Sequence, residues 1–253
     1  MTARVLVTRA AAQAGPLEAA LREAGLEPVG VPTIAVEIDP PGGPLDAAAR
    51  DLHRFAWAVV TSPNGARAIL AAAERTSTPP AAPSWAAIGD GTAALLERGG
   101  IPVAFRPTRA DAAALAEELP LAAGQEVVLL RGDLAGDELP ARLRARGAVV
   151  TDVVAYRTIE GPPASRRLLR EALDGGRPDV VVFASGSGAR GLVSLAAAER
   201  LEVDSIPAIC IGPETERQAR RLGFLVLATS PEPDAASLAA TTAAALAQPL
   251  ETR

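Results

Sequence analysis

The feature that most constrains the fold is an internal repeat with a nearly constant offset. Val5–Arg9 recurs as Val127–Arg131, so that equivalent residues lie 122 positions apart. Val59–Arg67 recurs as Val182–Arg190, with an offset of 123. We call the first pair of segments X and X′ and the second pair Y and Y′. Self-similarity at this spacing indicates repeated supersecondary units, so the order X, Y, X′, Y′ predicts two similar units.

Both units alternate short apolar runs with longer segments of helical period. Runs such as Val5–Val7, Val127–Leu130 and Val180–Phe183 are apolar throughout, which is typical of strands buried on both faces of a parallel sheet. Asn64–Glu74 and Thr215–Leu222 have the composition and spacing of helices. The alternation predicts an α/β fold class with two similar parallel-sheet, flavodoxin-like domains.

The repeat leaves two groupings of these segments open. In one, X with Y and X′ with Y′ form successive domains; in the other, Y and X′ form a central domain inserted between X and Y′. Stretches rich in proline and glycine at residues 40–44 and 159–163 separate X from Y and X′ from Y′, which favours the insertion. The predicted boundaries are 1–34 and 161–253 for discontinuous domain 1, 35–44 and 155–160 for linker strands, and 45–154 for inserted domain 2.

The composition excludes several classes of chemistry. The chain contains no lysine, which excludes Schiff-base enzymes and the Walker P-loop. His53 is the only histidine and Cys210 the only cysteine, so an internal disulfide and a cysteine-based metal site have no residues to form them. We interpret His53 as a solvated surface residue and Cys210 as packing in a strand.

The net charge and the hydropathy of the chain limit the kinds of partner and the cellular compartment that we expect. A net charge of −5 and only seven aromatic residues (Trp 2, Tyr 1, Phe 4) argue against a nucleic-acid partner. No apolar stretch approaches the length of a membrane span, and the N-terminus lacks the apolar run of a signal peptide. We expect a cytoplasmic protein with no membrane partner, and nothing in the sequence demands more than a monomer.

Small polar residues recur where the predicted strands end and helices begin. In doubly wound sheets ligands bind beyond the carboxyl ends of the strands, where free backbone N–H groups suit carboxylate or phosphate. Such residues are more often plain helix caps, but here they recur at matching points of both repeats. We predict that they bind a large polyanionic ligand. The candidates are Thr8, Arg9, Ser62, Asn64, Thr92, Arg131, Ser185, Gly186, Ser187 and Thr215.

Tyr156, the only tyrosine, ends a predicted strand. A tyrosine there is more often a core or rim residue, although a phenol at the edge of a cleft can donate a proton.

The order and spacing of seven segments together resemble the uroporphyrinogen-III synthase family over nearly the whole chain, although no single segment is specific. The segments are Val5–Arg9, Val59–Ala66, Ala87–Thr92, Leu129–Asp133, Val153–Thr158, Val182–Ala189 and Cys210–Thr215. The resemblance implies two α/β domains joined by a pair of strands, with the central domain inserted.

This resemblance also implies an activity. The family's reaction is the cyclisation of hydroxymethylbilane, a linear tetrapyrrole with eight carboxylates, through loss of water and inversion of the last pyrrole ring. The resemblance implies that this reaction needs no cofactor and no metal. Tyr156 matches the tyrosine that is suspected of assisting departure of the hydroxyl, and the polar turns match those that hold the acetate and propionate groups. The implied partners are this substrate and, as a possibility, the preceding pathway enzyme.

Two other functions have a similar architecture. One is a non-catalytic tetrapyrrole-binding or regulatory module that kept the fold and lost the reaction. The other is a periplasmic-type solute-binding protein, which the absent signal peptide argues against. Formation of product would favour the enzyme, whereas retention of a linear tetrapyrrole without product would favour the binding module.

Overall fold

The computed structural model of the protein describes residues 2–79 and 83–247. The chain divides into two compact units, which we call unit 1 (Met1–Ala35 and Ile159–Arg253) and unit 2 (Val36–Thr158). The chain passes from one unit to the other within strands β3 (Ile34–Ile38) and β8 (Val149–Glu160), which are neighbours in one sheet. The last six residues of the predicted domain 1, 248–253, lie outside the described residues.

Unit 1 is a five-stranded parallel sheet in the order β11-β10-β9-β1-β2. Counted along the unit itself, this order is the 2-1-3-4-5 arrangement of flavodoxin-like folds. Its strands are β1 (Arg4–Val7), β2 (Glu27–Gly30), β9 (Val180–Phe183), β10 (Ala208–Cys210) and β11 (Val226–Thr229). Its helices are α1 (Ala11–Glu23), α7 (Arg166–Asp174), α8 (Gly186–Glu199), α9 (Pro213–Arg221) and α10 (Ala235–Ala247), with a 3-10 turn at Pro163–Ser165.

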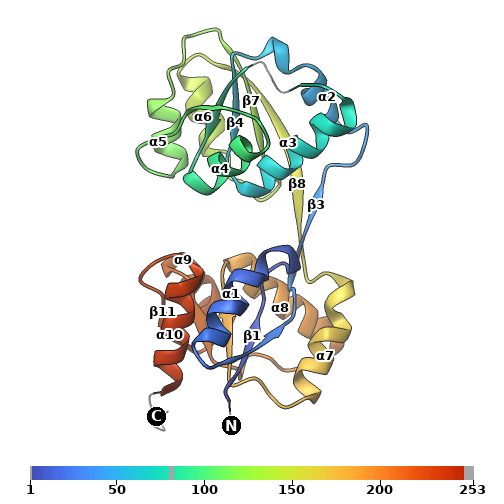
Figure 1. The fold of residues 1–253 in the computed structure, drawn as a ribbon, viewed down its shortest axis with the longest axis vertical. Helices are drawn as coiled ribbons and strands as arrows, with labels where there is room; N and C mark the ends of the chain where they lie inside the picture. Colours follow the sequence, from blue (N-terminus) through green and yellow to red (C-terminus); the bar gives the residue numbers. More distant parts are fainter. Residues whose placement is uncertain (1, 80–82, 248–253) are drawn as a thin grey trace. The chain divides into compact units, whose positions relative to one another are not determined.

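Side chains of this sheet point alternately into two cores, which is why its strands are apolar throughout. Val5 and Val7 pack with residues of α1 and α10, whereas Leu6 packs on the opposite face with residues of α7, α8 and α9. Figure 1 labels these helices beside the strands of unit 1. Both faces of the unit 1 sheet are therefore covered by helices.

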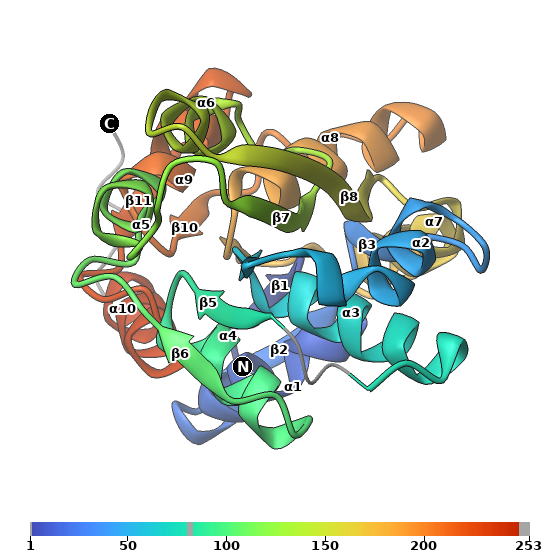
Figure 2. The ribbon, with the colours of Figure 1, turned by 90° about the horizontal axis from the view of Figure 1, so that it is seen from above.

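Unit 2 contains a six-stranded sheet in the order β3-β8-β7-β4-β5-β6, and its pairs from β8 to β6 are parallel. Its further strands are β4 (Trp57–Val60), β5 (Ser84–Ala87), β6 (Val103–Phe105) and β7 (Glu126–Gly132). Its helices are α2 (Pro44–Arg50), α3 (Pro63–Thr76), α4 (Asp90–Arg98), α5 (Ala112–Glu118) and α6 (Glu138–Ala145), with a 3-10 turn at Leu52–Arg54. Figure 2 shows α5 and α6 on one side of this row of strands and α2, α3 and α4 on the other. The predicted α/β fold class is confirmed in both units.

Equivalent positions of the repeat make equivalent local structures. Gly25 follows α1 with φ +77° and Gly147 follows α6 with φ +87°, a left-handed conformation that glycine adopts without strain. Ser62 and Ser185 cap α3 and α8, and each hydroxyl oxygen accepts a backbone N–H at 3.1 Å. The 122–123 offset read from the sequence therefore corresponds to the same strand–turn–helix geometry in both units.

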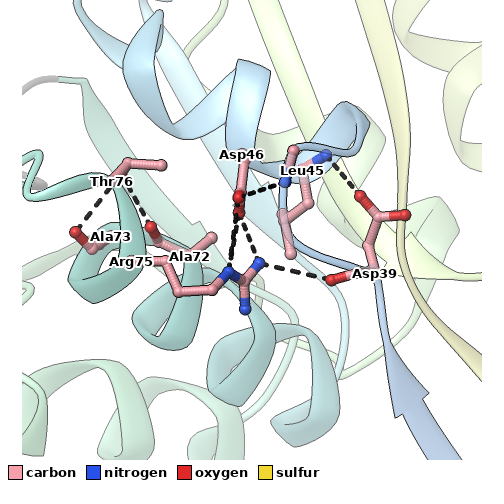
Figure 3. Close-up of polar contacts among 8 residues, drawn as sticks. Asp39, Leu45, Asp46, Ala72, Ala73, Arg75 and Thr76 are labelled. Carbon is pink, nitrogen blue, oxygen red and sulfur yellow. Dashed lines mark hydrogen bonds and ion pairs between the residues drawn. The ribbon is translucent and has the colours of Figure 1, made fainter.

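An ion pair fixes the chain where β3 leads into α2. Arg75 of α3 donates from Nε to Asp46 Oδ1 at 3.1 Å, and the Asp46 side chain is only 3% exposed (Figure 3). Arg75 also donates to the backbone oxygen of Asp39, and the Asp39 carboxylate accepts the Leu45 N–H at 2.9 Å. These contacts lower the pKa of the Asp46 carboxyl, chiefly through the Arg75 hydrogen bond and the Gly42 N–H. The end of β3 is thus held against α3.

Within the described ranges, no helix is long and apolar enough to cross a membrane.

Candidate functional site

Tyr156 lies on β8 at the carboxyl end of β7, where Gly132 is its partner in the parallel ladder. Its phenol oxygen lies 3.0 Å from the hydroxyl oxygen of Ser62, which follows β4. The side chain is half-buried, so its ring packs against the unit 2 core while the phenol remains at the sheet edge. The two hydroxyl groups, 94 residues apart in sequence, form the polar centre of the candidate site.

Ser62 is held in place by the helix that it caps. Its Oγ accepts the N–H of Gly65 at 3.1 Å, which satisfies one of the free donors at the start of α3. A Cβ on Gly65 would lie 2.9 Å from the backbone oxygen of Leu130, so the first turn of α3 packs directly against the end of β7. This close packing brings the Ser62 turn within reach of Tyr156.

A hollow of about 480 Å³ adjoins the phenol. Ile38 and Val154, both large apolar side chains left partly exposed, form part of its wall, and Arg157 supplies a positive charge. The lining residues are Glu37, Ile38, Asp39, Pro40, Val154, Tyr156 and Arg157. The Arg75–Asp46 contacts described above hold one part of this wall, because they bind Asp39 (Figure 3). An apolar ring with a hydroxyl-bearing substituent fits such surroundings chemically, because apolar walls and a few placed polar groups are typical of ligand sites.

The corresponding edge of unit 1 carries a second set of hydroxyl groups. Ser185 Oγ accepts the Gly188 N–H at 3.1 Å and lies 3.0 Å from Ser187 Oγ. Thr8 is buried and donates to the backbone oxygen of Val182 at 2.8 Å, and Thr215 is buried in the first turn of α9. Gly186 allows this turn to approach α9, because a Cβ there would lie 3.1 Å from Gln218 Cγ.

Arg9 follows β1 at this edge of unit 1. Burial lowers the pKa of its guanidinium group, and no ion pair to it is found among the residues that the structure describes. Arg190, by contrast, binds Glu160 through Nε at 3.0 Å to both carboxylate oxygens. A half-buried arginine without a carboxylate partner is suited to bind an anionic ligand, because partial desolvation strengthens its attraction for negative charge.

Comparisons with known proteins decide the family. The family model described as "Uroporphyrinogen-III synthase HemD" matches residues 15–240. The chain belongs to the uroporphyrinogen-III synthase family. It is 29% identical over 232 residues to "Uroporphyrinogen-III synthase" of Synechococcus elongatus, which covers 86% of each chain. It is 30% identical over 230 residues to the chloroplastic protein of that name from Oryza sativa subsp. japonica, covering 87% of this chain and 73% of the relative.

Solved structures share the fold. A mutant uroporphyrinogen III synthase from the extremely thermophilic bacterium Thermus thermophilus matches with a TM-score of 0.66 at 20% identity, covering 97% of this chain and 99% of the other. The protein named uroporphyrinogen-III synthetase from Helicobacter pylori 26695 gives a TM-score of 0.64 at 16% identity, with 97% and 100% covered. The resemblance to this family in the sequence is therefore confirmed, as is the fold class of two α/β domains that it implied.

The predicted residues fall into two sets, one at each sheet edge. Unit 1 carries Thr8, Arg9, Ser185, Gly186, Ser187 and Thr215, and unit 2 carries Ser62, Asn64, Thr92, Arg131 and Tyr156. Ser62 and Tyr156, two candidates of unit 2, are joined by the contact between their hydroxyl oxygens. Thr92 is buried in the first turn of α4, and the Asn64 amide oxygen accepts a hydrogen bond from Arg67 at 2.9 Å. The assignment of these residues to substrate stays a prediction.

Arg131 has an internal role in this structure. Its side chain is 8% exposed, its Nε donates to Asp152 at 2.6 Å, and its Nη1 donates to the backbone oxygen of Gly136. The hydrogen bond to Asp152 raises the pKa of the Arg131 guanidinium group. This pairing anchors the turn after β7, and it leaves Arg131 less suited than Arg9 to bind an added carboxylate.

The residues set aside as structural behave as expected. His53 is exposed on its 3-10 turn. Cys210 is fully buried in β10, where burial raises the pKa of its thiol to about 12, so the reactive thiolate form is not populated at neutral pH. Across residues 2–79 and 83–247, no group of three or more His, Cys, Asp or Glu side chains is placed to hold a metal ion.

The residues that surround the phenol were not predicted from the sequence. Gly132 was quoted only as part of a motif, yet a Cβ there would lie 2.6 Å from Tyr156 Cζ. Ile38 and Val154 were not named as lining residues, although both lie in or beside the predicted linker strands. Val154 lies two positions before Tyr156 on the same strand, and this spacing was the available signal in the sequence.

Proposed function

We propose that this chain cyclises hydroxymethylbilane to uroporphyrinogen III, with loss of water and inversion of the last pyrrole ring. Membership of the family supports the reaction. The observation that carries the proposal in this chain is the Tyr156 phenol, which adjoins a partly apolar hollow and lies 3.0 Å from a second hydroxyl.

The chemistry begins at the hydroxymethyl group of the substrate. Hydroxide is a poor leaving group, so a proton must reach the oxygen as the carbon–oxygen bond breaks and water departs. The Tyr156 O–H donates this proton in our proposal, and the phenolate that remains recovers a proton after ring closure. The electrons of the pyrrole stabilise the carbon centre that loses water, so the enzyme needs to place one proton donor and to hold the chain in the shape that closes.

The carboxylates of the substrate are the second part of the proposal. Eight negative charges require partners. In unit 1 these are Arg9 and the hydroxyl-bearing turns of Ser185, Ser187 and Thr215, and in unit 2 the turn of Thr92 supplies hydrogen-bond donors. The half-burial of Arg9 supports this role in unit 1. The remaining predictions, of a monomer in the cytoplasm with no nucleic-acid or membrane partner and of an encounter with the preceding pathway enzyme, stay predictions.

A coupled assay tests the proposed reaction. Hydroxymethylbilane is generated in place, the purified chain is added, and the oxidised porphyrins are separated by isomer. We expect mainly the type III isomer. Formation of only the spontaneous type I isomer by a folded sample would reject the enzyme and leave a tetrapyrrole-binding module, which direct measurement of substrate retention would then test.

A further inference from the structure

We propose that Ser62 and Gly132 are positioning residues for the Tyr156 phenol, and that the Ser62 hydroxyl donates its hydrogen bond to the phenol oxygen. The inference rests on the proposed function, because it concerns how the proton donor of that reaction is held. It assigns Ser62 to the phenol, whereas the sequence assigned Ser62 to the carboxylates of the substrate.

The donors and acceptors at Ser62 fix the direction of its hydrogen bond to the phenol. A serine hydroxyl has one hydrogen to donate and two lone pairs to accept. One lone pair of Ser62 Oγ accepts the Gly65 N–H at 3.1 Å, and Tyr156 Oη lies 3.0 Å away. If the phenol gives its proton to the substrate, the hydrogen between the two oxygens must come from Ser62. The chain of donors then runs from Gly65 N–H to Ser62 O–H to Tyr156 Oη.

This direction matches the charge that develops in the reaction. As the phenol proton leaves, negative charge grows on Tyr156 Oη, and a hydrogen bond donated by Ser62 stabilises that charge. Ser62 also lies at the first turn of α3, where the partial positive charge of the helix acts in the same sense. The donor is in place before the reaction, so no group has to reorient during it.

Gly132 supplies the space in which the ring lies. A Cβ at this position would come within 2.6 Å of Tyr156 Cζ and 2.8 Å of its Oη, closer than any real Cβ contact. Gly132 does not have a positive φ, so the absence of a side chain is needed for the ring and not for the backbone. The parallel ladder shifts register between Arg131 and Gly132, which places Tyr156 directly opposite the glycine.

The equivalent turn of unit 1 shows that the cap alone does not explain the contact. Ser185 accepts the Gly188 N–H at the same 3.1 Å, but the further contact of its Oγ is Ser187, at 3.0 Å. Serine therefore caps the helix in both units. Among the described residues, Ser62 is the capping serine that contacts a phenol.

A double-mutant cycle tests the role of Ser62. Ser62→Ala, Ser62→Thr, Tyr156→Phe and the Ser62→Ala/Tyr156→Phe double variant are assayed for kcat and KM with hydroxymethylbilane. We expect Ser62→Ala to lower kcat about tenfold with little change in KM, and Ser62→Thr, which keeps the hydroxyl, to restore most of it. In the Tyr156→Phe background the same substitution should change kcat less than about twofold, because its effect acts through the phenol.

The matched control for loss of a cap is Asp111→Ala. Asp111 caps α5 in the same unit by accepting the Ala114 N–H at 2.7 Å, so this variant loses a cap without touching Tyr156. Its kcat should equal that of the wild type. A Ser62→Ala effect that is equal in both backgrounds, or that appears as a higher KM with unchanged kcat, would overturn the positioning role and favour direct contact with substrate.

Gly132→Ala tests the space for the ring, with Gly136→Ala as its control. A Cβ at Gly136 has nothing within 4 Å, so the control adds the same methyl group nearby at no steric cost. We expect about a 10²-fold loss of kcat for Gly132→Ala, because misplacing a catalytic group by about 1 Å has an effect of that size, and none for Gly136→Ala. Equal activity of the two variants would overturn the role of Gly132.

A spectroscopic readout does not depend on turnover. The chain has one tyrosine, so protein labelled with ¹³C at tyrosine Cζ gives a single resonance. Ser62→Ala and Gly132→Ala should shift it, whereas Asp111→Ala and Gly136→Ala should not; four unshifted spectra would contradict the contact itself. A wild-type chain that yields only type I isomer rejects the proposed function, whereas type III product with an additive cycle rejects only the positioning role.

Discussion

The two units place different side chains at the same point of the repeat. The register shift between Arg131 and Gly132 adds one residue to β8, so the offset between X and X′ rises from 122 to 123 there and Tyr156 in unit 2 corresponds to Thr33 in unit 1. Thr33 is fully buried, and its hydroxyl lies 2.9 Å from the Thr8 backbone oxygen and 2.7 Å from that of Gly188. Tyr156 is half-buried and reaches the Ser62 hydroxyl. The same junction of strand and capped helix is thus closed by a buried hydroxyl in unit 1 and left with an accessible phenol in unit 2.

The comparison separates structural from chemical roles for residues of similar type. Thr33 shares the single hydrogen of its hydroxyl between two buried backbone oxygens, and the Thr8 oxygen also accepts the Thr33 N–H. Its contribution is therefore to stability. Tyr156 lines the hollow together with Ile38 and Val154, which is consistent with the proton transfer proposed for it. A repeat therefore predicts where a turn will be, but the side chain at one position decides what that turn does.

Substitutions at Tyr156 and Thr33 should differ most in their effect on kcat. Tyr156→Phe should lower kcat by about 10²–10⁴-fold, the range of a general acid, with little loss of thermal stability. Thr33→Val should leave the kcat of the folded protein unchanged but destabilise it by about 0.5–1.5 kcal/mol, because a buried hydroxyl hydrogen bond is lost. Isomer-resolved kinetics and denaturant melts on both variants measure these two effects. A Tyr156→Phe variant with wild-type kcat would show that the phenol has no role in the chemistry.

The turns capped by Ser62 and Ser185 differ in how much space they leave for a Cβ atom at the glycine that follows. Gly65→Ala places a Cβ 2.9 Å from the backbone oxygen of Leu130, which has to move, and we expect a loss of about 1–3 kcal/mol in the free energy of unfolding. Gly188→Ala meets Thr8 Oγ1 at 3.3 Å, so a small shift of one side chain accommodates it and the loss should be smaller. Urea titrations of both variants provide the measurement, and equal losses would show that the two turns are packed alike.

Arg9, which follows β1, and Arg131, near the end of β7, should also differ in what their substitution changes. Arg9→Gln should raise KM about tenfold and leave stability nearly unchanged, because its guanidinium group has no ion pair among the described residues. Arg131→Gln should instead lower stability, since Asp152 and the Gly136 oxygen lose their donor. Kinetics and thermal melts on the pair decide the matter; unchanged KM for Arg9→Gln would remove it from the substrate site.

The smallest effect concerns the ion pair behind the hollow. Arg75 lowers the pKa of Asp46 in the folded chain, so the pair stabilises unit 2 above the ordinary carboxyl pKa of 3.8, and its contribution is lost as pH falls through the lowered value. The stability difference between wild type and Asp46→Asn should therefore be constant near neutral pH and shrink below about pH 4. Thermal melts across this range test it, and a pH-independent difference would argue against the ion pair.

The sequence predicted the features that depend on local pattern. Runs such as Val180–Phe183 are strands, Ser62 and Ser185 cap helices as their spacing indicates, and the α/β class follows from the alternation. The edge strands β2 and β6 were not predicted from the pattern of apolar runs, because their residues are only partly buried and their composition is mixed.

The candidate site was harder to predict than the fold. The contact of Ser62 with Tyr156 joins residues 94 positions apart and depends on a register shift in one ladder, which no local pattern reveals. Arg9 and Arg131 occupy equivalent positions, and only the structure shows that Arg131 is bound internally. Sequence spacing identifies such residues as a set, whereas packing distinguishes their roles.

The strand orders of the two sheets have one further consequence. Read from the second strand of X or X′, unit 1 runs β2-β1-β9-β10-β11 and unit 2 runs β8-β7-β4-β5-β6, so each sheet joins the X-type strands of one copy to the Y-type strands of the other. This is the pattern of a domain swap carried out inside a single polypeptide. In unit 2 the segment order is circularly permuted relative to unit 1, which makes the chain a natural example of two connectivities that build one topology.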